Sequence, residues 1–81
     1  HHLFGLWAAG QLGYENEERE RYIETIIIFE FQKSHDETVL DKVLRDFQEA
    51  QLEISIHRIE REFERCWEEA KKVLMNEKEK P

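Results

Sequence analysis

Apolar residues recur at helical spacing in four stretches of the chain, which short polar or glycine-containing runs separate. The first stretch places Leu3, Leu6 and Trp7 on one predicted side, and the run from Gly10 to Gly13 ends it, because glycine readily adopts the left-handed conformation that stops helices. We predict helices at about residues 2–11, 16–32, 36–51 and 55–77, followed by a frayed tail at 78–81. The predicted fold is an all-α four-helix bundle, mostly antiparallel, in which the first helix is truncated and residues 1–81 form one domain.

The second stretch supports two interpretations. Asn16 is a cap-type residue ahead of Glu17 and Glu18, and these acids suit the start of a helix. The apolar residues that follow fit helical spacing, but several also alternate and are β-branched or aromatic, as in a strand. We favour a helix because the rest of the chain offers no convincing partner strand. Its expected apolar stripe comprises Tyr22, Ile23, Ile26, Ile27 and Phe31.

The boundaries of the last two helices rest on capping residues. Ser34 and Glu37 have the spacing of a capping box, and Asp36 is a competing cap. Beyond Gln51 the phase of the apolar stripe changes, so we expect a bend between Gln51 and Ser55, with Ser55 capping the last helix. No glycine or proline lies in this region, and a continuous helix of about 40 residues stays open as the alternative.

Composition narrows the class of protein. A net charge of −7 argues against a nucleic-acid surface, since phosphate binding needs clustered basic residues. No apolar run reaches the roughly 20 residues that a membrane-spanning helix requires. The single cysteine, Cys66, has no partner for an internal disulfide, so an oxidising compartment has no support. These features favour a cytoplasmic protein.

Few residues are arranged for chemistry. Glu53, His57 and Glu60 have i, i+4 and i+7 spacing and are the candidate metal ligands, but the Glu-x-x-His pairs of di-metal bundles are absent. A solvated charged face explains the three residues more simply, and we expect no metal and no cofactor. Cys66 is flanked by glutamates that disfavour a thiolate and lies on an apolar stripe, so we expect a core residue. With no catalytic motif in the chain, we predict that it is not an enzyme.

The last predicted helix also carries an acidic ridge beside a basic one. We interpret these ridges as a solvated face in which residues three apart form ion pairs, and a partner surface is the alternative. The acidic ridge comprises Glu60, Glu64 and Glu68; the basic ridge comprises Arg58, Arg61 and Arg65; the expected pairs are Arg61 with Glu64 and Glu62 with Arg65.

Several short runs together resemble one known family. The run from Leu6 to Gly10 (LWAAG), followed by Leu12 and Gly13, resembles the signature of the ATPase inhibitor subunit zeta, a small family of alphaproteobacterial type. The runs 36–43 (DETVLDKV) and 54–59 (ISIHRI) are similar to the starts of its third and last helices. The resemblance covers about residues 3–75.

The resemblance implies a function. Members of this family are four-helix bundles whose N-terminal inhibitory segment is thought to insert into the catalytic head of the F-type ATP synthase and block ATP hydrolysis. That segment would lie ahead of Leu3, so this chain would be the folded scaffold, with weak inhibition or none. Residues that would anchor the inhibitory helix or face the partner are Leu3, Phe4, Leu6 and Trp7.

Two other functions stay open at this point. The chain could be a self-associating helical adaptor that uses its isoleucine-rich second helix, or a metal-binding bundle. We expect a monomer, with a dimer as the alternative. For Trp7 we expect packing onto the bundle, with a partner-facing position as the alternative.

Overall fold

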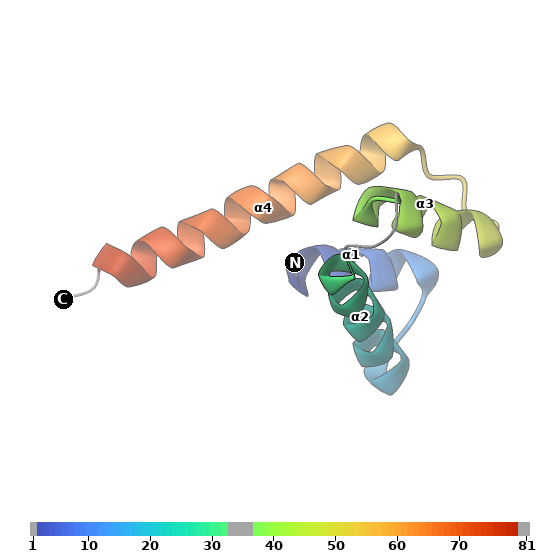
Figure 1. Ribbon diagram of the computed structural model, residues 1–81, viewed down its shortest axis with the longest axis horizontal. Helices are drawn as coiled ribbons and strands as arrows, with labels where there is room; N and C mark the ends of the chain where they lie inside the picture. Colours follow the sequence, from blue (N-terminus) through green and yellow to red (C-terminus); the bar gives the residue numbers. More distant parts are fainter. Residues whose placement is uncertain (1, 33–36, 80–81) are drawn as a thin grey trace.

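A computed structural model of the protein describes residues 2–32 and 37–79, with the backbone alone for 74–79. The helices are α1 (His2–Leu12), α2 (Asn16–Phe31), α3 (Val39–Glu49) and α4 (Ile56–Glu79), and the described residues contain no strand. Helix α4 packs against α3 and α1 and runs in the opposite direction to α1, while α2 crosses α1 (Figure 1). The predicted all-α bundle is confirmed, and the ambiguous second stretch is a helix.

Helix α1 ends in a turn built on Gly13, whose φ is +80°. The Gly13 N–H donates to the carbonyl of Gly10 at 3.1 Å, and the Tyr14 N–H donates to the carbonyl of Ala9 at 3.0 Å. These two bonds form a Schellman motif, which satisfies carbonyl groups that the end of a helix otherwise leaves without partners. Of the glycines expected to end the helix, Gly13 is therefore the one that does so, since Gly10 lies inside the helix.

Helix α2 begins differently from the sequence prediction. Glu15 is the N-cap in extended conformation, and its side chain makes no capping hydrogen bond. The expectation that Asn16 caps the helix is wrong: Asn16 is the first helical residue and has a φ of 55°, a left-handed value that asparagine tolerates better than most residues. Glu17 and Glu18 occupy the first turn, where the helix dipole stabilises negative charge.

Helix α3 begins with a capping box formed by Thr38 and Asp41. The Asp41 N–H donates to the Thr38 hydroxyl at 3.2 Å, and the Thr38 N–H donates to the Asp41 carboxylate at 3.2 Å. Both bonds satisfy N–H groups at a helix start, where the helix itself supplies no acceptors. Thr38 directly precedes the apolar face that begins at Val39, which places the helix start there.

Thr38, and not Ser34 or Asp36, is the N-cap of α3. Ser34 and Asp36 lie outside the described residues. Glu37 precedes α3, and its carboxylate accepts a hydrogen bond from the Arg45 guanidinium at 2.8 Å. Helix α3 thus starts later than the predicted position at residue 36.

A Schellman motif also ends helix α3. The Gln51 N–H donates to the carbonyl of Gln48 at 3.0 Å, and the Leu52 N–H donates to the carbonyl of Phe47 at 2.8 Å. Gln51 has a φ of 61°, so a glutamine occupies the position that favours glycine. Leu52 packs against the core cluster that contains Phe47, which supplies the apolar contact typical of the motif.

Helices α3 and α4 are therefore separate, and the break lies where the phase of the apolar stripe changes. Residues 52–55 are non-helical, and the Ser55 hydroxyl accepts a hydrogen bond from the Arg58 N–H at 3.3 Å. Ser55 caps α4 as expected. The alternative of one continuous helix is wrong because Gln51 leaves the right-handed helical region.

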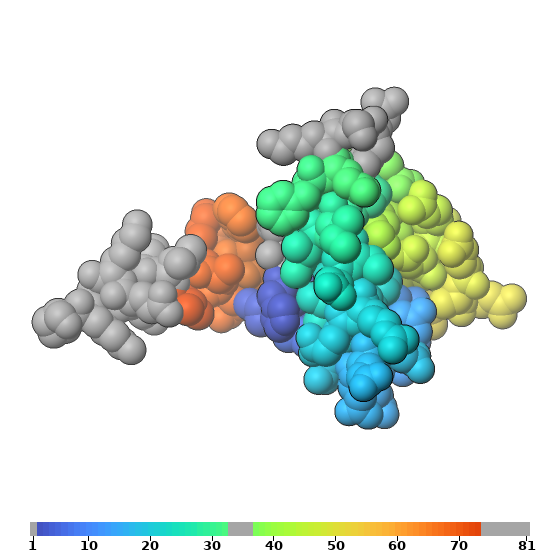
Figure 2. All heavy atoms as spheres, turned by 60° about the horizontal axis from the view of Figure 1, so that its bottom comes forward, coloured from blue at the N-terminus to red at the C-terminus, as the bar shows by residue number. Residues whose placement is uncertain are grey.

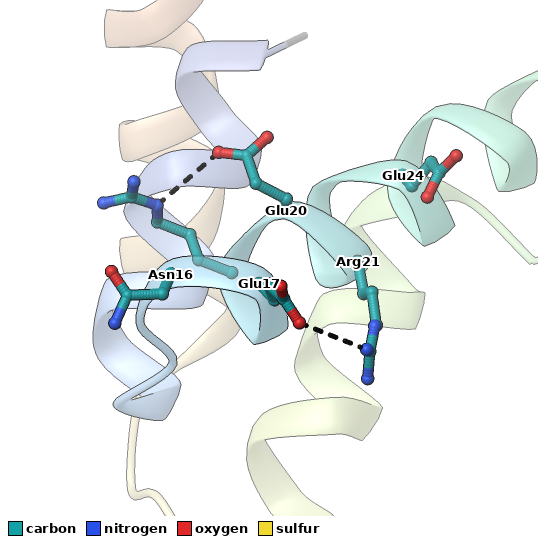
Figure 3. Close-up of a pocket in the computed structure, with 6 residues that line it drawn as sticks. Asn16, Glu17, Glu20, Arg21 and Glu24 are labelled. Carbon is teal, nitrogen blue, oxygen red and sulfur yellow. Dashed lines mark ion pairs between the residues drawn. The ribbon is translucent and has the colours of Figure 1, made fainter.

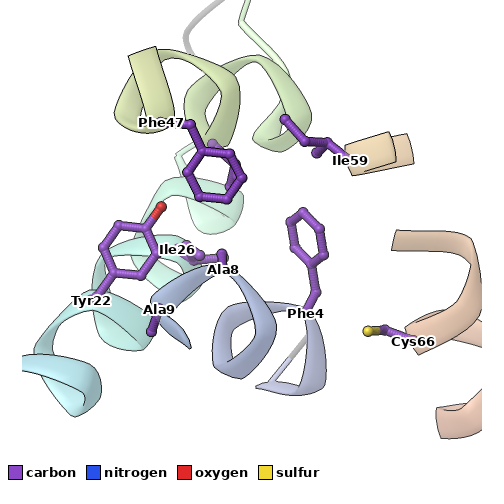
Figure 4. Packing of buried hydrophobic residues seen from close by; sticks show 9 residues of the cluster. Phe4, Ala8, Ala9, Tyr22, Ile26, Phe47, Ile59 and Cys66 are labelled. Atoms are coloured by element: carbon purple, nitrogen blue, oxygen red, sulfur yellow. The ribbon is translucent and has the colours of Figure 1, made fainter. Parts of the chain in front are cut away.

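The core is built around α1, which packs against both α2 and α4 (Figure 4). The buried residues of α1 are Phe4, Gly5, Ala8 and Ala9, whereas the side chain of Leu3 is 42% exposed. The spacing places Leu3, Leu6 and Trp7 on one side, of which Leu6 and Trp7 are half-buried, but it does not identify the fully buried residues. Because α1 is apolar on every side, its sequence pattern does not indicate which side faces the core. The main buried cluster comprises Phe4, Ala8, Ala9, Tyr22, Ile26, Val43, Phe47, Ile59 and Cys66.

The lack of a side chain at Gly5 lets α2 approach α1 closely. A Cβ atom built on Gly5 would lie 3.2 Å from Cγ1 of Ile23, which is itself buried. A larger residue at this position would push two helices apart, because packed interiors have little free space. Glycine at position 5 thus sets the distance between α1 and α2.

Helix α4 extends beyond the rest of the bundle (Figure 1). Its Ile59 and Cys66 are buried, but Val73 is 54% exposed. The radius of gyration is 13.8 Å, compared with about 12 Å for a compact domain of this length. The apolar stripe of α4 therefore continues past the part of the helix that α1 and α3 cover.

Candidate interaction site at the N-terminal helix

Four aromatic rings form a column that joins α4, α1 and α3. Phe63 of α4 meets Phe4 of α1 edge to face, with ring centroids 5.1 Å apart. Phe4 stacks on Trp7 at 6.0 Å, and Trp7 meets Phe47 of α3 edge to face at 5.7 Å. Pairs of this geometry each contribute about 0.5–1.5 kcal/mol beyond the burial of their area. The column fixes the first helix of the chain between two later ones.

The residues proposed from the sequence as anchor or partner contacts fall into two groups. Phe4 is fully buried and Trp7 is half-buried against Phe47, so both pack onto the bundle. Leu6 is half-buried, and Leu3 is the most exposed of the four at 42%. Phe4 and Trp7 are thus placed to hold α1, and Leu3 is the member that another molecule can reach.

An apolar hollow lies between the start of α1 and the middle of α4. Its volume is about 260 Å³, and its lining includes Leu3, Phe4, Cys66 and Ala70. Burial raises the pKa of the Cys66 thiol, which keeps it protonated. Cys66 is buried in the core, as expected. Its protonated thiol is a poor nucleophile, because the thiolate is the reactive form.

A polar network that sequence reasoning missed connects α2 and α3. The Tyr22 hydroxyl donates to the Asp46 carboxylate at 2.9 Å, and Lys42 Nζ lies 2.6 Å from the same carboxylate. Lys42 Nζ also lies 5.2 Å from the centre of the Tyr22 ring. Burial, and next the hydrogen bond to Asp46, raises the pKa of Tyr22. The sequence signals only the i, i+4 pair Lys42 and Asp46, because Tyr22 lies on another helix.

The candidate metal ligands do not share a helix face. Glu53 lies in the non-helical segment before α4, so the i, i+4, i+7 spacing does not apply to it. His57 Nδ1 and Glu60 are 4.0 Å apart and exposed to solvent. Within residues 2–32 and 37–73, no three His, Cys, Asp or Glu side chains are grouped so that they could hold a metal ion.

The charged ridges of α4 form short ion pairs along the helix. Arg65 and Glu62 are 2.9 Å apart, which is one of the two pairs expected from the sequence. Lys71 and Glu68 are 3.6 Å apart. Such exposed pairs contribute little stability, because water screens them.

Helix α2 exposes much of its apolar sequence. Tyr22, Ile23 and Ile26 are buried, but Ile28 is 52% exposed and Phe31 is 81% exposed. Of the apolar stripe expected from the sequence, Ile27 is 36% exposed, so the core covers only Tyr22, Ile23 and Ile26. Three consecutive isoleucines cannot all face one side of a helix, so the pattern did not determine which of them the core would cover.

The geometry defines a class of protein: a small helical bundle around a buried first helix, with exposed apolar and charged faces of the kind that bind other proteins. None of the described helices is long and apolar enough to cross a membrane. The family model of the ATPase inhibitor subunit zeta matches residues 1–73, and the chain belongs to this family. No curated protein and no solved structure matches the chain.

The family identified from the short sequence runs is thus confirmed over most of the chain. Its name indicates a protein that inhibits an ATPase, and inhibitor subunits are in general not enzymes. The aromatic column lies within the matched residues, and so do α1, α2 and α3 in full.

Proposed function

We propose that this chain is the folded scaffold of an inhibitor of ATP hydrolysis by the F-type ATP synthase, with α1 as the base of the inhibitory segment. Family membership over residues 1–73 is the observation that carries the proposal. The proposed partner is the catalytic head of the enzyme, and the proposed location is the cytoplasm, toward which the head of the bacterial enzyme projects. In this proposal the protein acts as a monomer and without a cofactor.

The position of α1 supports this role. A segment that blocks a rotating enzyme must transmit force to the scaffold that holds it. Phe4 is fully buried between α1 and α4, and its ring contacts Phe63 and Trp7. Burial of one such side chain contributes about 1.5–3 kcal/mol, so the base of the segment would resist being pulled from the bundle. Such a block is mechanical and needs no covalent step.

The test compares two proteins in a hydrolysis assay with purified F-type ATPase. One is the chain itself, and the other carries a zeta-family inhibitory segment added before His1. We expect inhibition by the extended protein at micromolar concentrations and little by the chain alone. If the extended protein leaves hydrolysis unchanged in that range, the inhibitor function is wrong for this chain.

Two variants of the extended protein test the anchoring role. Trp7→Ala removes two contacts of the aromatic column and should raise the concentration that gives half inhibition at least about tenfold. Val73→Ala changes an exposed side chain on the projecting part of α4 and should leave that concentration unchanged. Circular dichroism of both variants establishes that the fold is retained.

A further inference from the structure

We propose that the solvent-facing side of α2 is a docking surface for a helix of another protein, one that has apolar side chains at one end and lysines or arginines over its next turns. The surface, here called the α2 stripe, comprises Glu17, Glu20, Glu24, Ile27, Ile28 and Phe31. The inference does not depend on whether the chain inhibits ATP hydrolysis.

The α2 stripe is one continuous side of the helix. Its members recur three or four positions apart, opposite the buried side chains of Tyr22, Ile23 and Ile26. All six are exposed, with Ile27 the least exposed of the three apolar residues at 36%. In Figure 2, α2 runs along the front of the molecule, from its blue lower end to its green upper end.

The C-terminal half of the stripe is apolar. Phe31 is the most exposed large apolar side chain in the described part of the protein, at 81%, and Ile28 is exposed over 52% of its surface. Large apolar side chains clustered on a helix face favour a partner that removes them from water. The partner must therefore present apolar side chains to this end.

The N-terminal half of the stripe is acidic. Glu17 is paired with Arg21 at 3.6 Å, and Glu20 with Arg19 at 3.8 Å (Figure 3). Both pairs are exposed and therefore weak, so a partner cation can replace either arginine at little cost. Glu24 is also exposed and lies between the two halves. This half fits lysines or arginines, and the net charge of −7 attracts a basic partner over longer distances.

A second copy of the chain does not fit the whole stripe. If two copies paired their α2 helices in parallel, Glu17, Glu20 and Glu24 of one copy would meet the same glutamates of the other. In an antiparallel pair over the full length, the apolar half of each copy would meet the acidic half of the other. Both arrangements are unfavourable, because like charges repel and a carboxylate loses water without gaining a partner. The stripe is complementary to an apolar and basic helix.

The length of the stripe sets the size of the occupant. From Glu17 to Phe31 the helix rises roughly 21 Å, which corresponds to about four turns of a partner helix. Side chains at i, i+3, i+4 and i+7 of that helix would reach the surface, as in other helix-in-groove complexes.

The experiment uses two fluorescently labelled synthetic helical peptides of about 18 residues, long enough to cover the stripe. Both have leucines at one end; one carries lysines over the next turns and the other carries glutamates there. Anisotropy titrations with the whole chain should show micromolar binding of the lysine peptide, weakened by added salt, and at least about tenfold weaker binding of the glutamate peptide.

Matched variants locate the binding site. Phe31→Ser and Glu24→Lys on the stripe should each weaken binding of the lysine peptide at least about tenfold. Val73→Ser and Glu64→Lys make similar changes at exposed positions of α4; the first should have no effect, and the second only the small effect of the changed net charge. All four sites are exposed, so the variants should fold, which circular dichroism checks.

Three results would overturn the proposal. The first is equal binding of the two peptides, or no binding of either. The second is an equal loss of affinity in the α4 variants, which would place binding elsewhere. The third comes from sedimentation equilibrium: a wild-type dimer that Ile28→Glu converts to a monomer would make a second copy of the chain the occupant of the stripe.

Discussion

Gln51 and Gly13 occupy the same position in two Schellman motifs, and this equivalence allows a quantitative test. Both residues have positive φ, 61° for Gln51 and 80° for Gly13. In each motif the two hydrogen bonds that close the helix end are formed, with lengths from 2.8 to 3.1 Å. Gln51→Gly should therefore stabilise the protein without changing any contact of the folded backbone.

The expected magnitude follows from two opposing terms. The left-handed conformation costs a non-glycine residue about 1–2 kcal/mol, which the substitution recovers. Glycine makes the unfolded chain more flexible, which costs about 0.5–1 kcal/mol. The net gain is about 0.5–1 kcal/mol in the free energy of unfolding. For a domain of this size, 1 kcal/mol corresponds to about 4–8 °C in melting temperature.

Urea unfolding followed by far-UV circular dichroism measures this change. Gln48→Gly is the matched control: it makes the same substitution at an exposed position inside α3, where glycine should cost about 1 kcal/mol. Gly13→Ala should destabilise by about 1 kcal/mol, because alanine meets the same left-handed penalty at the end of α1. A Gln51→Gly midpoint equal to or below that of the wild type, with the same slope, would refute the reasoning.

Three further predictions concern single residues. Gly10→Ala should stabilise by about 0.5–1 kcal/mol in thermal unfolding, because the Cβ position is open, whereas Gly5→Ala should lack this gain because its Cβ presses on a buried side chain. Thr38→Ala should lower the free energy of unfolding in urea by about 1 kcal/mol through loss of the α3 cap. Burial raises the pKa of Tyr22 in the folded state, so as the pH rises past about 10 the unfolded chain loses this proton first and stability falls, by up to about 1.4 kcal/mol per pH unit. Tyr22→Phe should remove that contribution, and urea midpoints of both proteins from pH 8 to 11 measure it; an unchanged slope in the variant would contradict the assignment.

Sequence patterns predicted a helix start correctly where only one residue was a candidate for the cap. Ser55 lies directly before a clean apolar stripe, and it is the cap of α4. At the start of α3 we expected a cap at Ser34 or Asp36 and did not consider Thr38 with Asp41, which have the same spacing as Ser34 with Glu37. The spacing could not choose between them, whereas the proximity of Thr38 to the apolar face could have done so. The conformation of Gln51 has no local signal, because the packing of Leu52 on the core determines where α3 ends.

The candidate site was partly predictable. The sequence singled out Phe4 and Trp7 from the unusual composition of the first helix, but not which of its sides is buried, since that depends on the close approach of Gly5 to α2. The contact between Phe4 and Phe63 joins α1 to α4, which are far apart in the sequence, and no local pattern specifies it. The exposure of Phe31 also depends on tertiary structure, because the core covers only the middle of α2.

The central position of α1 has a consequence for the order of folding. Helix α1 is made before α2, α3 and α4 and packs against α4, so the core that they share cannot close until α4 has been made. Contacts between distant parts of a chain require the closure of a long loop and slow the folding of small domains. Until α4 arrives, the apolar surface of α1 stays accessible to water and to other chains. The core of the bundle is therefore completed only once α4 has been made, and Phe4 of α1 is among the last core residues to be buried.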